Sequence, residues 1–220
     1  MSIFDEELSD LKVQILKMGS LVEEAIAKSI KSLVERDSDL AKLVIENDDR
    51  INTFDVSVDE ECIRLIALRQ PTAGDLRFIT TAMKITTDLE RMGDYAVDIC
   101  ERALELNTEP QLKPYIDIPR MAEIAEGMVH DALQAFLDRN TALAYEVIKR
   151  DDEVDQLTVQ IFNELVLYMI KDSSTISRAI KISYISKYLE RIADHATNLA
   201  EMVVYMNEGK MIRHTILPED

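Results

Sequence analysis

The stretch Leu89-Glu-Arg-Met-Gly-Asp-Tyr-Ala-Val-Asp-Ile99 occurs a second time, 100 residues later, as Leu189-Glu-Arg-Ile-Ala-Asp-His-Ala-Thr-Asn-Leu199. In both copies the apolar residues recur three and four positions apart, which is typical of an amphipathic helix. A sequence that repeats itself over so long a distance predicts an architecture built twice. We therefore expect two related helical halves.

The earlier part of each half is repeated as well. The residues Leu33-Val-Glu-Arg-Asp-Ser-Asp-Leu-Ala41 match Phe136-Leu-Asp-Arg-Asn-Thr-Ala-Leu-Ala144, now at a spacing of 103 residues. The spacing changes by three residues in the turn before the third helix, where insertions cost little.

Apolar spacing predicts three helices in each half. Pro71 ends the second helix, because the residue before a proline avoids the helical conformation, and Thr72 can cap the third. The expected helices span residues 8–33, 40–70 and 72–106 in the first half, and 118–139, 141–171 and 173–206 in the second.

The chain has only five glycines and five prolines in 220 residues, which favours long helices joined by few turns. The predicted fold is all-α, with six long helices in two tandem three-helix bundles related by an internal pseudo-twofold repeat. The bundles are expected at residues 1–108 and 120–208, with a proline-rich linker at 109–119 and a C-terminal tail at 209–220.

Charge narrows the range of partners. With 25 basic and 42 acidic residues the chain carries a formal charge of −17, which disfavours nucleic acids and anionic lipid surfaces. The longest uninterrupted apolar run, Leu165 to Ile170, is far shorter than the roughly 20 residues that cross a bilayer. The acidic N-terminus does not resemble an export signal. We expect a cytoplasmic protein without direct membrane insertion, which reaches the inner membrane only through protein partners.

Two cysteines, Cys62 and Cys100, fall inside helical patterns. Their expected role is that of small buried apolar residues in a reducing compartment, in preference to a redox or catalytic pair.

An acidic row marks the third helix of each half. Glu90, Asp94 and Asp98 are four residues apart and occupy a wedge about 80° wide, with Glu101 inside it. The second copy has Glu190, Asp194, Asn198 and Glu201 at these positions. Measured from the centre of the apolar stripe, the row is expected to face away from the core of its own bundle.

A second acidic group lies in the second helix of each half, at the edge of the buried face. Its members are Asp48, Asp49 and Asn52 in the first half and Asp151, Asp152 and Asp155 in the second. In an antiparallel bundle this edge could lie beside the third-helix row, although spacing alone does not decide whether the two groups converge.

Acids four residues apart on a helix repel one another, whereas a bound cation turns that repulsion into attraction. Ligands that are all oxygen suit Mg²⁺, Mn²⁺, Ca²⁺ or iron better than zinc. The alternative is that a chain with 42 acids places some at this spacing by chance and leaves them solvated. Because the pattern is duplicated, both interpretations stay open on the residues alone.

Histidines add little to this picture. His195, beside Asp194, is a candidate ligand, but a lone exposed histidine is more often an ordinary surface residue. His130 and His214 have no comparable setting, and none of the three forms the Glu-x-x-His pair of di-iron bundles.

The paired stretches resemble the signatures of the PhoU family of phosphate-specific transport system accessory proteins. Gln70-Pro-Thr-Ala-Gly-Asp-Leu-Arg77 resembles a turn of that family, as do the duplicated Asp-Asp pairs in the second helices. The resemblance extends from the first helix to about Met206.

The resemblance implies six helices in two bundles that bind metal through surface carboxylates, with iron clusters, Mg²⁺ or Mn²⁺ described among relatives. It also implies a negative regulator of phosphate uptake and of the phosphate-starvation response, and not an enzyme. The implied partners are the ATPase subunit of the phosphate ABC transporter, a sensor histidine kinase and a second copy of the chain in a homodimer.

Carried over by position, the implied metal ligands of the first half are Asp48, Asp49, Asn52, Glu90, Asp94 and Asp98, and those of the second are Asp151, Asp152, Asp155, Glu190, Asp194 and Asn198. Asn52 departs from the family, which has an aspartate there. An amide oxygen brings no charge, so weaker binding is expected in the first half.

Two other functions stay open. A metal-dependent enzyme is compatible with carboxylate clusters, although the sequence shows no paired nucleophile and base and no glycine-rich phosphate loop. The second open function is that of a purely structural scaffold whose acidic side chains are only solvated. Arg69 and Arg77, around the Pro71 turn, are candidate partner contacts, against the ordinary interpretation as helix-end charges.

Overall fold

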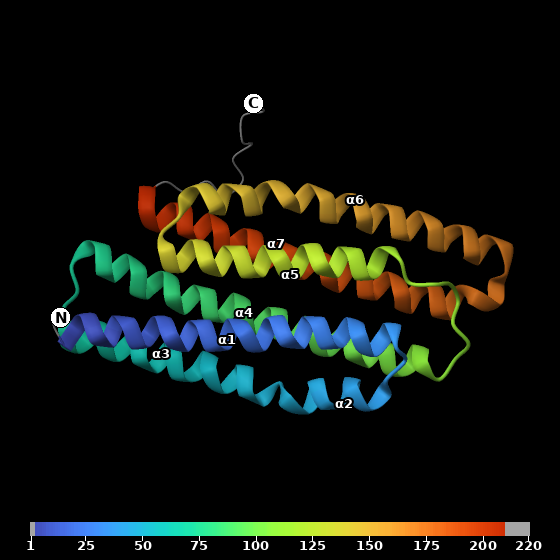
Figure 1. Cartoon of the computed structure of the whole chain (residues 1–220), viewed down its shortest axis with the longest axis horizontal. Helices are drawn as coiled ribbons and strands as arrows, with labels where there is room; N and C mark the ends of the chain where they lie inside the picture. Colours follow the sequence, from blue (N-terminus) through green and yellow to red (C-terminus); the bar gives the residue numbers. More distant parts are fainter. Residues whose placement is uncertain (1–2, 210–220) are drawn as a thin grey trace.

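The computed structural model describes residues 3–209, and within them every regular element is a helix (Figure 1). The helices of the first half are α1 (Ile3–Val34), α2 (Ser38–Asn47), α3 (Asp49–Arg69) and α4 (Ala73–Asn107); those of the second are α5 (Asp117–Asp138), α6 (Thr141–Lys171), a short 3₁₀ helix η1 (Ser173–Thr175) and α7 (Ile176–Glu208). The all-α fold with two three-helix bundles is confirmed.

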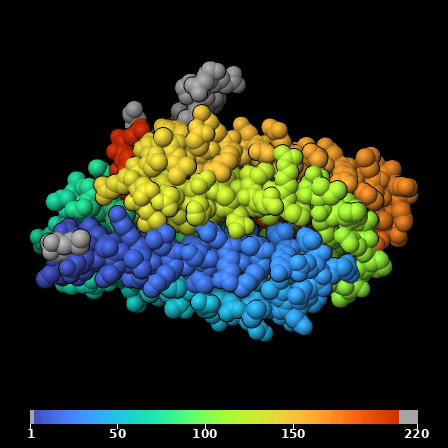
Figure 2. All heavy atoms as spheres, viewed as in Figure 1, coloured from blue at the N-terminus to red at the C-terminus, as the bar shows by residue number. Residues whose placement is uncertain are grey.

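The two halves pack side by side into one elongated body (Figure 1). Along the join α1 lies against α5 and α4 lies against α7, and one large hydrophobic core runs through both halves, beside a small separate cluster of Ala41, Val44 and Cys100. Figure 2 shows α1 and α5 in contact along the face seen there. Near one end of the join, the buried rings of Phe78 and Phe136 stack with centroids 5.0 Å apart. Corresponding helices therefore face each other across the join.

Close approach of α1 and α5 depends on Gly19. A Cβ built on this residue would lie 2.4 Å from Leu133 Cδ1, closer than real Cβ contacts come. The missing side chain therefore lets Leu133 of one half fill space against the backbone of the other.

The second predicted helix of the first half is interrupted. The pattern predicted one helix from residue 40 to residue 70, whereas the structure has α2 and α3 joined at Asp48. The amide of Asp48 donates to the Ile45 carbonyl, three residues back, and the Ile51 amide donates to the Asp48 carbonyl. This local 3₁₀ hydrogen bonding breaks the α-helical ladder, while the backbone of Asp48 stays in the helical region. The second half keeps α6 continuous.

Repeated polar contacts close the turns. The Asn107 side-chain amide donates to the Ser32 carbonyl and Ser38 Oγ, and that of Asn207 donates to the Arg139 carbonyl and Thr141 Oγ1. Each asparagine thus ties the end of the third helix to the turn between the first two.

The third helix begins after Thr72 as predicted, but the expected cap hydrogen bond is absent from this part of the structure. Instead the Thr72 hydroxyl donates to Asp75 Oδ2 over 2.9 Å. The linker before α5 ends at Ile116, three residues earlier than expected. Pro119 falls in the first turn of α5, where its missing N–H leaves no helical bond unmade.

Candidate metal centres

Each half places an acidic cluster in the seam between its second and third helices. We define the second acidic cluster as Asp151 and Asp155 of α6 with Glu190 and Asp194 of α7. The first acidic cluster consists of Asp48, which joins α2 to α3, Asn52 and Asp55 of α3, and Glu90 and Asp94 of α4. The two helices of each seam run in opposite directions, so their acids meet in reverse order.

The acids of the second cluster lie near enough to influence one another's pKa values. Burial, followed by the charges of Asp194 and Asp155, raises the pKa of Asp151 to about 6. Burial, followed by the charges of Glu190 and Asp194, raises the pKa of Asp155. Carboxylates of α6 and α7 thus share a region of excess negative charge.

The first cluster behaves in the same way with different members. Burial raises the pKa of Asp48, the hydrogen bond from Asn52 opposes this, and the charge of Asp94 adds to it. Burial also raises the pKa of Glu90, with further contributions from the charges of Asp94 and Asp55. The two groups that spacing left unplaced are therefore neighbours in both halves.

Asp55 is the member that sequence reasoning missed. It follows Asp48 by two helical turns, on the same side of the helix, and acts on Glu90 across the seam. Thr158 occupies the equivalent position of the second half, so duplication gives no signal for Asp55. Asp55 supplies a negative charge in the half where Asn52 lacks one.

The acidic rows, predicted to face away from the core of their own bundle, are only partly exposed. Only 14% of the Glu190 side chain and 25% of the Glu90 side chain are exposed, against 37% for Asp194 and 42% for Asp94. The second helix of the same half packs beside each row, since α3 contacts α4 and α6 contacts α7. The acids therefore lie half-buried at the margin of that seam.

Basic side chains of α4 and α7 form ion pairs with three of these acids, Asp94, Asp194 and Glu190. Arg91 contacts Asp94 Oδ2 at 3.4 Å, Arg191 contacts Asp194 Oδ2 at 3.2 Å, and Lys187 pairs with Glu190 Oε1. With the side chains so placed, no three carboxylate, imidazole or thiol groups among residues 3–209 converge closely enough to hold a metal ion.

The residues present nevertheless fit a hard cation. Glu190 Oε2 is buried and accepts no hydrogen bond, so this carboxylate has an unused oxygen directed into the protein. Exposed ion pairs such as Arg191–Asp194 contribute only about 0–1 kcal/mol, so a cation can displace them cheaply. Asp151, Asp155, Glu190 and Asp194 are the side chains that would hold it in the second half.

Some predicted ligands lie outside the seams. Asp49 and Asp152 are exposed on the outer side of their helices. Asp98 lies one turn beyond Asp94, where burial and the charges of Glu101 and Asp94 raise its pKa, and its charge also reaches Tyr188 of α7. Asn198 occupies the equivalent position of α7. Asp49, Asp98 and Asp152 therefore lie at the margins of the clusters, where their charges raise the pKa values of seam acids or their own pKa is raised by them.

The histidines take other contacts. His195 Nδ1 lies 2.7 Å from Asp88 Oδ1, and His130 Nδ1 lies 3.2 Å from Glu23 Oε1, both across the join between the halves. His214 lies outside the described residues. Both cysteines are buried and reduced, and burial raises the pKa of each thiol to about 12, which confirms them as small apolar residues.

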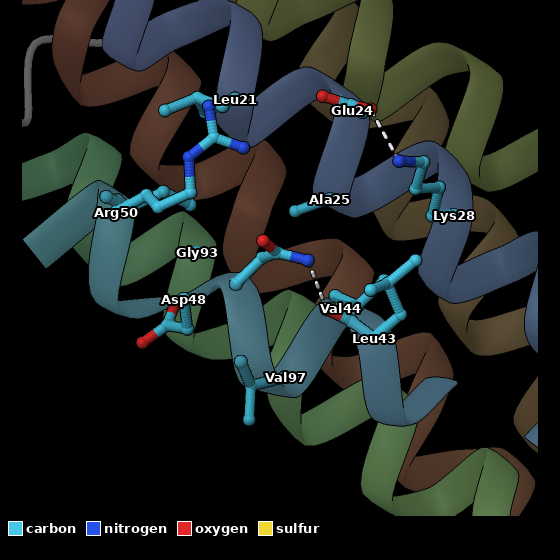
Figure 3. Close-up of a pocket in the computed structure, with 12 residues that line it drawn as sticks. Leu21, Glu24, Ala25, Lys28, Leu43, Val44, Asp48, Arg50, Gly93 and Val97 are labelled. Carbon is cyan, nitrogen blue, oxygen red and sulfur yellow. Dashed lines mark hydrogen bonds and ion pairs between the residues drawn. The ribbon is translucent and has the colours of Figure 1, made fainter. Parts of the chain in front are cut away.

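A small hollow borders the first cluster (Figure 3). It lies between α1, the α2–α3 junction and α4, and its lining includes Asp48, Gly93 and the Glu24–Lys28 ion pair. Its volume of about 50 Å³ is enough for a few water molecules and far below the roughly 300 Å³ of small-molecule pockets.

Comparison with known proteins follows the same division into halves. A family model described as the PhoU domain matches residues 15–103 and again residues 118–203. A phosphate-specific transport system accessory protein PhoU homolog of Aquifex aeolicus is 46% identical over 214 residues, covering 97% of each chain. The phosphate-specific transport system accessory protein PhoU of Escherichia coli is 36% identical over 211 residues, covering 96% of this chain and 88% of that one.

Solved structures share the fold. A crystal structure of PhoU from Pseudomonas aeruginosa superimposes with a TM-score of 0.91 at 40% identity, over 94% of this chain and all of that one. A phosphate transport system regulatory protein PhoU from Streptococcus pneumoniae gives a TM-score of 0.88 at 33% identity, over 94% and 98% of the chains.

Proposed function

The chain belongs to the PhoU family, and on that premise we propose that it is a regulatory accessory protein of a phosphate-specific transport system. In this proposal it restrains phosphate uptake and the phosphate-starvation response when phosphate is plentiful. It acts in the cytoplasm, through the ATPase subunit of the phosphate ABC transporter and a sensor histidine kinase.

The observation that supports this most is the family match to both halves, together with relatives named as phosphate-transport accessory proteins over nearly the full length. The charge of −17 supports recruitment by proteins in preference to lipid. Among residues 3–209 no helix is long and apolar enough to cross a membrane.

Deletion of the gene tests the proposal. In phosphate-rich medium the deletion strain is expected to express a phosphate-starvation reporter and to take up more labelled phosphate, and the restored gene is expected to reverse both effects. A reporter that stays silent in the deletion strain would contradict the proposed repression. Binding of the purified chain to the purified ATPase subunit and to the kinase tests the two partners separately.

We further propose that the two acidic clusters bind divalent or iron ions, in a site that can hold more than one ion. Support comes from the mutual elevation of carboxyl pKa values and from the unpartnered Glu190 oxygen. Such an ion supplies positive charge that holds α6 to α7 and α3 to α4.

Metal analysis of matched variants separates this proposal from a structural scaffold with solvated acids. Glu190→Gln combined with Asp194→Asn is expected to lower Mn²⁺ affinity at least about tenfold with the fold intact. Glu123→Gln combined with Glu126→Gln removes the same charge from α5, outside both clusters, and is expected to leave the affinity nearly unchanged. Equal losses in the two variants would indicate nonspecific attraction.

Two further expectations belong to this proposal. A homodimer predicts twice the mass of 25.1 kDa in light scattering. The alternative of a metal-dependent enzyme predicts that the metal-loaded protein turns over a substrate with no partner present.

A further inference from the structure

A groove between α1 and α3, which we call the α1–α3 groove, is lined by apolar side chains and by two bases. It encloses about 460 Å³, and its apolar lining includes Val13 and Leu16, which are 44% and 43% exposed, and the half-buried ring of Phe54. The two bases are Lys17 of α1 and Arg50 of α3, and both are exposed. Apolar groups left open to solvent beside charged groups are typical of contact surfaces for other molecules.

The α1–α3 seam has the same register as the α5–α6 seam of the second half. The Ser57 hydroxyl donates to Gln14 between α1 and α3, and the Gln160 amide donates to Asp117 between α5 and α6. These two hydrogen bonds join residues that are 103 positions apart, the spacing of the copied stretches. Residues 103 apart therefore occupy equivalent positions in the two seams, and the second half shows what contacts those positions allow.

The positions of Lys17 and Arg50 hold an ion pair in the second half. Arg120 and Glu153 occupy them there, and their side chains are in contact at 2.8 Å. The first half keeps the base on its first helix and replaces the acid on its second with another base. Lys17 and Arg50 thus lie within reach of the same group but carry like charge, which costs free energy until an anion binds both.

No acid within residues 3–209 forms an ion pair with either base. Glu24 is the carboxylate among the described residues that line the groove, and it pairs with Lys28. The hydrogen bond from Lys28 is the main cause that lowers the pKa of Glu24, and the charge of Arg50 adds a smaller contribution. In Figure 3 Glu24 is linked to Lys28, whereas Arg50 extends toward Leu21 of α1. The acid that would complete the groove therefore has to come from another molecule.

Charge also indicates what kind of molecule this is. The described residues that line the groove include two bases and one acid, which Lys28 neutralises, whereas the equivalent residues of the second half include one base and two acids. In a chain of net charge −17 the groove is thus a local exception. A second copy docked through the same groove would bring Lys17 and Arg50 against themselves, whereas an acidic partner would meet them favourably.

We propose that the α1–α3 groove docks an amphipathic helix of a partner protein, with its apolar side on Val13 and Leu16 and a carboxylate between Lys17 and Arg50. A groove between two helices suits a third helix, which presents side chains at positions i, i+3, i+4 and i+7 along one side. The inference goes beyond the proposed function, because it concerns the chemistry of the partner segment and holds whichever protein carries that segment.

Two synthetic helical peptides of about 16 residues test it directly. Both carry leucines at positions i, i+3, i+4 and i+7, one with glutamates and the other with lysines on the flanks, and binding to the full-length chain is followed by fluorescence anisotropy. The chain is expected to bind the glutamate peptide at least about tenfold more tightly than the lysine peptide. Its net charge of −17 favours the lysine peptide, so the expected order would come from a local basic site.

The internal repeat supplies matched charge variants. Arg50→Glu gives Lys17 the kind of partner that Arg120 has in the second half, so it is expected to weaken binding of the glutamate peptide at least about tenfold. Arg120→Glu changes the net charge by the same amount outside the groove and is expected to leave that affinity nearly unchanged. Both arginines are exposed, so folding is expected to persist, which circular dichroism checks.

Apolar variants then test the contact with the leucines. Val13→Ser combined with Leu16→Ser is expected to weaken binding of the glutamate peptide at least about tenfold. Val56→Ser combined with Leu76→Ser changes exposed apolar residues that do not line the groove, and this matched control is expected to bind as the unmodified chain does. All four positions are at least 39% exposed, so these variants are expected to fold as well.

Three results would overturn the proposal: no binding of the glutamate peptide, equal or tighter binding of the lysine peptide, or equal losses in a variant and its matched control. A dimer in light scattering that Val13→Ser with Leu16→Ser converts to monomer would overturn it too, because it would assign the groove to a second copy. Neither peptide contains any part of the transporter, so failure here leaves the proposed function standing, and failure of the deletion experiment leaves this inference standing.

Discussion

His195 of α7 places its Nδ1 2.7 Å from Asp88 Oδ1 of α4, across the join between the two halves. Through the internal repeat, Asp88 corresponds to Tyr188 and His195 corresponds to Tyr95. The rings of Tyr95 and Tyr188 stack with centroids 6.0 Å apart. The same pair of positions therefore joins α4 to α7 twice, once through a polar contact and once through aromatic rings.

Removal of either member of the Asp88–His195 pair should weaken the join. Both side chains are more than 80% buried, so each single alanine variant leaves a partly buried polar group without its partner and is expected to lower the free energy of unfolding by about 1–2 kcal/mol. The double variant should cost less than the sum, with a coupling energy of about 1 kcal/mol. Urea unfolding of the four proteins at neutral pH measures this. Additive losses would show that the contact contributes nothing.

Close packing of α1 on α5 predicts an effect of side-chain size at Gly19. Gly19→Val is expected to lower the free energy of unfolding by about 2 kcal/mol, because Leu133 must move and the core is already full. Gly74→Ala is the control: a Cβ there meets no atom within 4 Å, so the change should be neutral or stabilise α4 by up to about 1 kcal/mol. Thermal unfolding of both variants checks the pair, and equal effects would contradict the packing argument.

The helices and their duplication could be predicted because apolar spacing and the copied stretches at Leu89 and Leu189 are local properties of the sequence. The packing of α4 on α7 could not, because part of that buried surface consists of hydroxyl residues. Thr86 and Ser186 are buried, and each hydroxyl donates to a carbonyl of its own helix, at Met83 and Ser183. Because the hydroxyl of such a residue finds a hydrogen-bond acceptor in its own helix, the residue can be buried although it is polar. A prediction of burial from polarity therefore misses it.

The candidate site was predicted in part for similar reasons. Spacing placed Glu90 and Asp94 in one row, and the structure brings Asp48 beside them. The interruption of the helix at Asp48 and the role of Asp55 escaped prediction. Both belong to the first half alone, so comparison of the halves gave no signal for either.

The elevated pKa of Asp151 predicts how stability depends on pH. Its pKa of about 6 in the folded chain exceeds its ordinary value of 3.8, so the folded state holds this proton more tightly than the unfolded state. Without metal, stability should therefore fall as pH rises between about 4 and 6. Asp151→Asn should remove much of that slope and, with allowance for partial solvent exposure, stabilise the protein by about 2 kcal/mol at pH 7. Urea unfolding in a chelator measures this.

Asp152→Asn is the control for that experiment, because the side chain is the exposed neighbour in sequence and lies outside the seam. It should leave the slope nearly unchanged. A slope that survives in Asp151→Asn would assign the proton uptake to another group.

The different acids of the two clusters predict how each half responds to added charge. Asn52→Asp should tighten Mn²⁺ binding in the first half about tenfold, because it adds a fifth carboxylate beside Asp48, Asp55, Glu90 and Asp94, and Asp55→Asn should weaken it. Thr158→Asp is the matched change in the second half and tests whether any added acid has the same effect. Calorimetric titration with Glu190→Gln/Asp194→Asn as the background isolates the first cluster. If Asp55→Asn leaves that affinity unchanged, Asp55 acts on Glu90 through charge alone and takes no part in holding the ion.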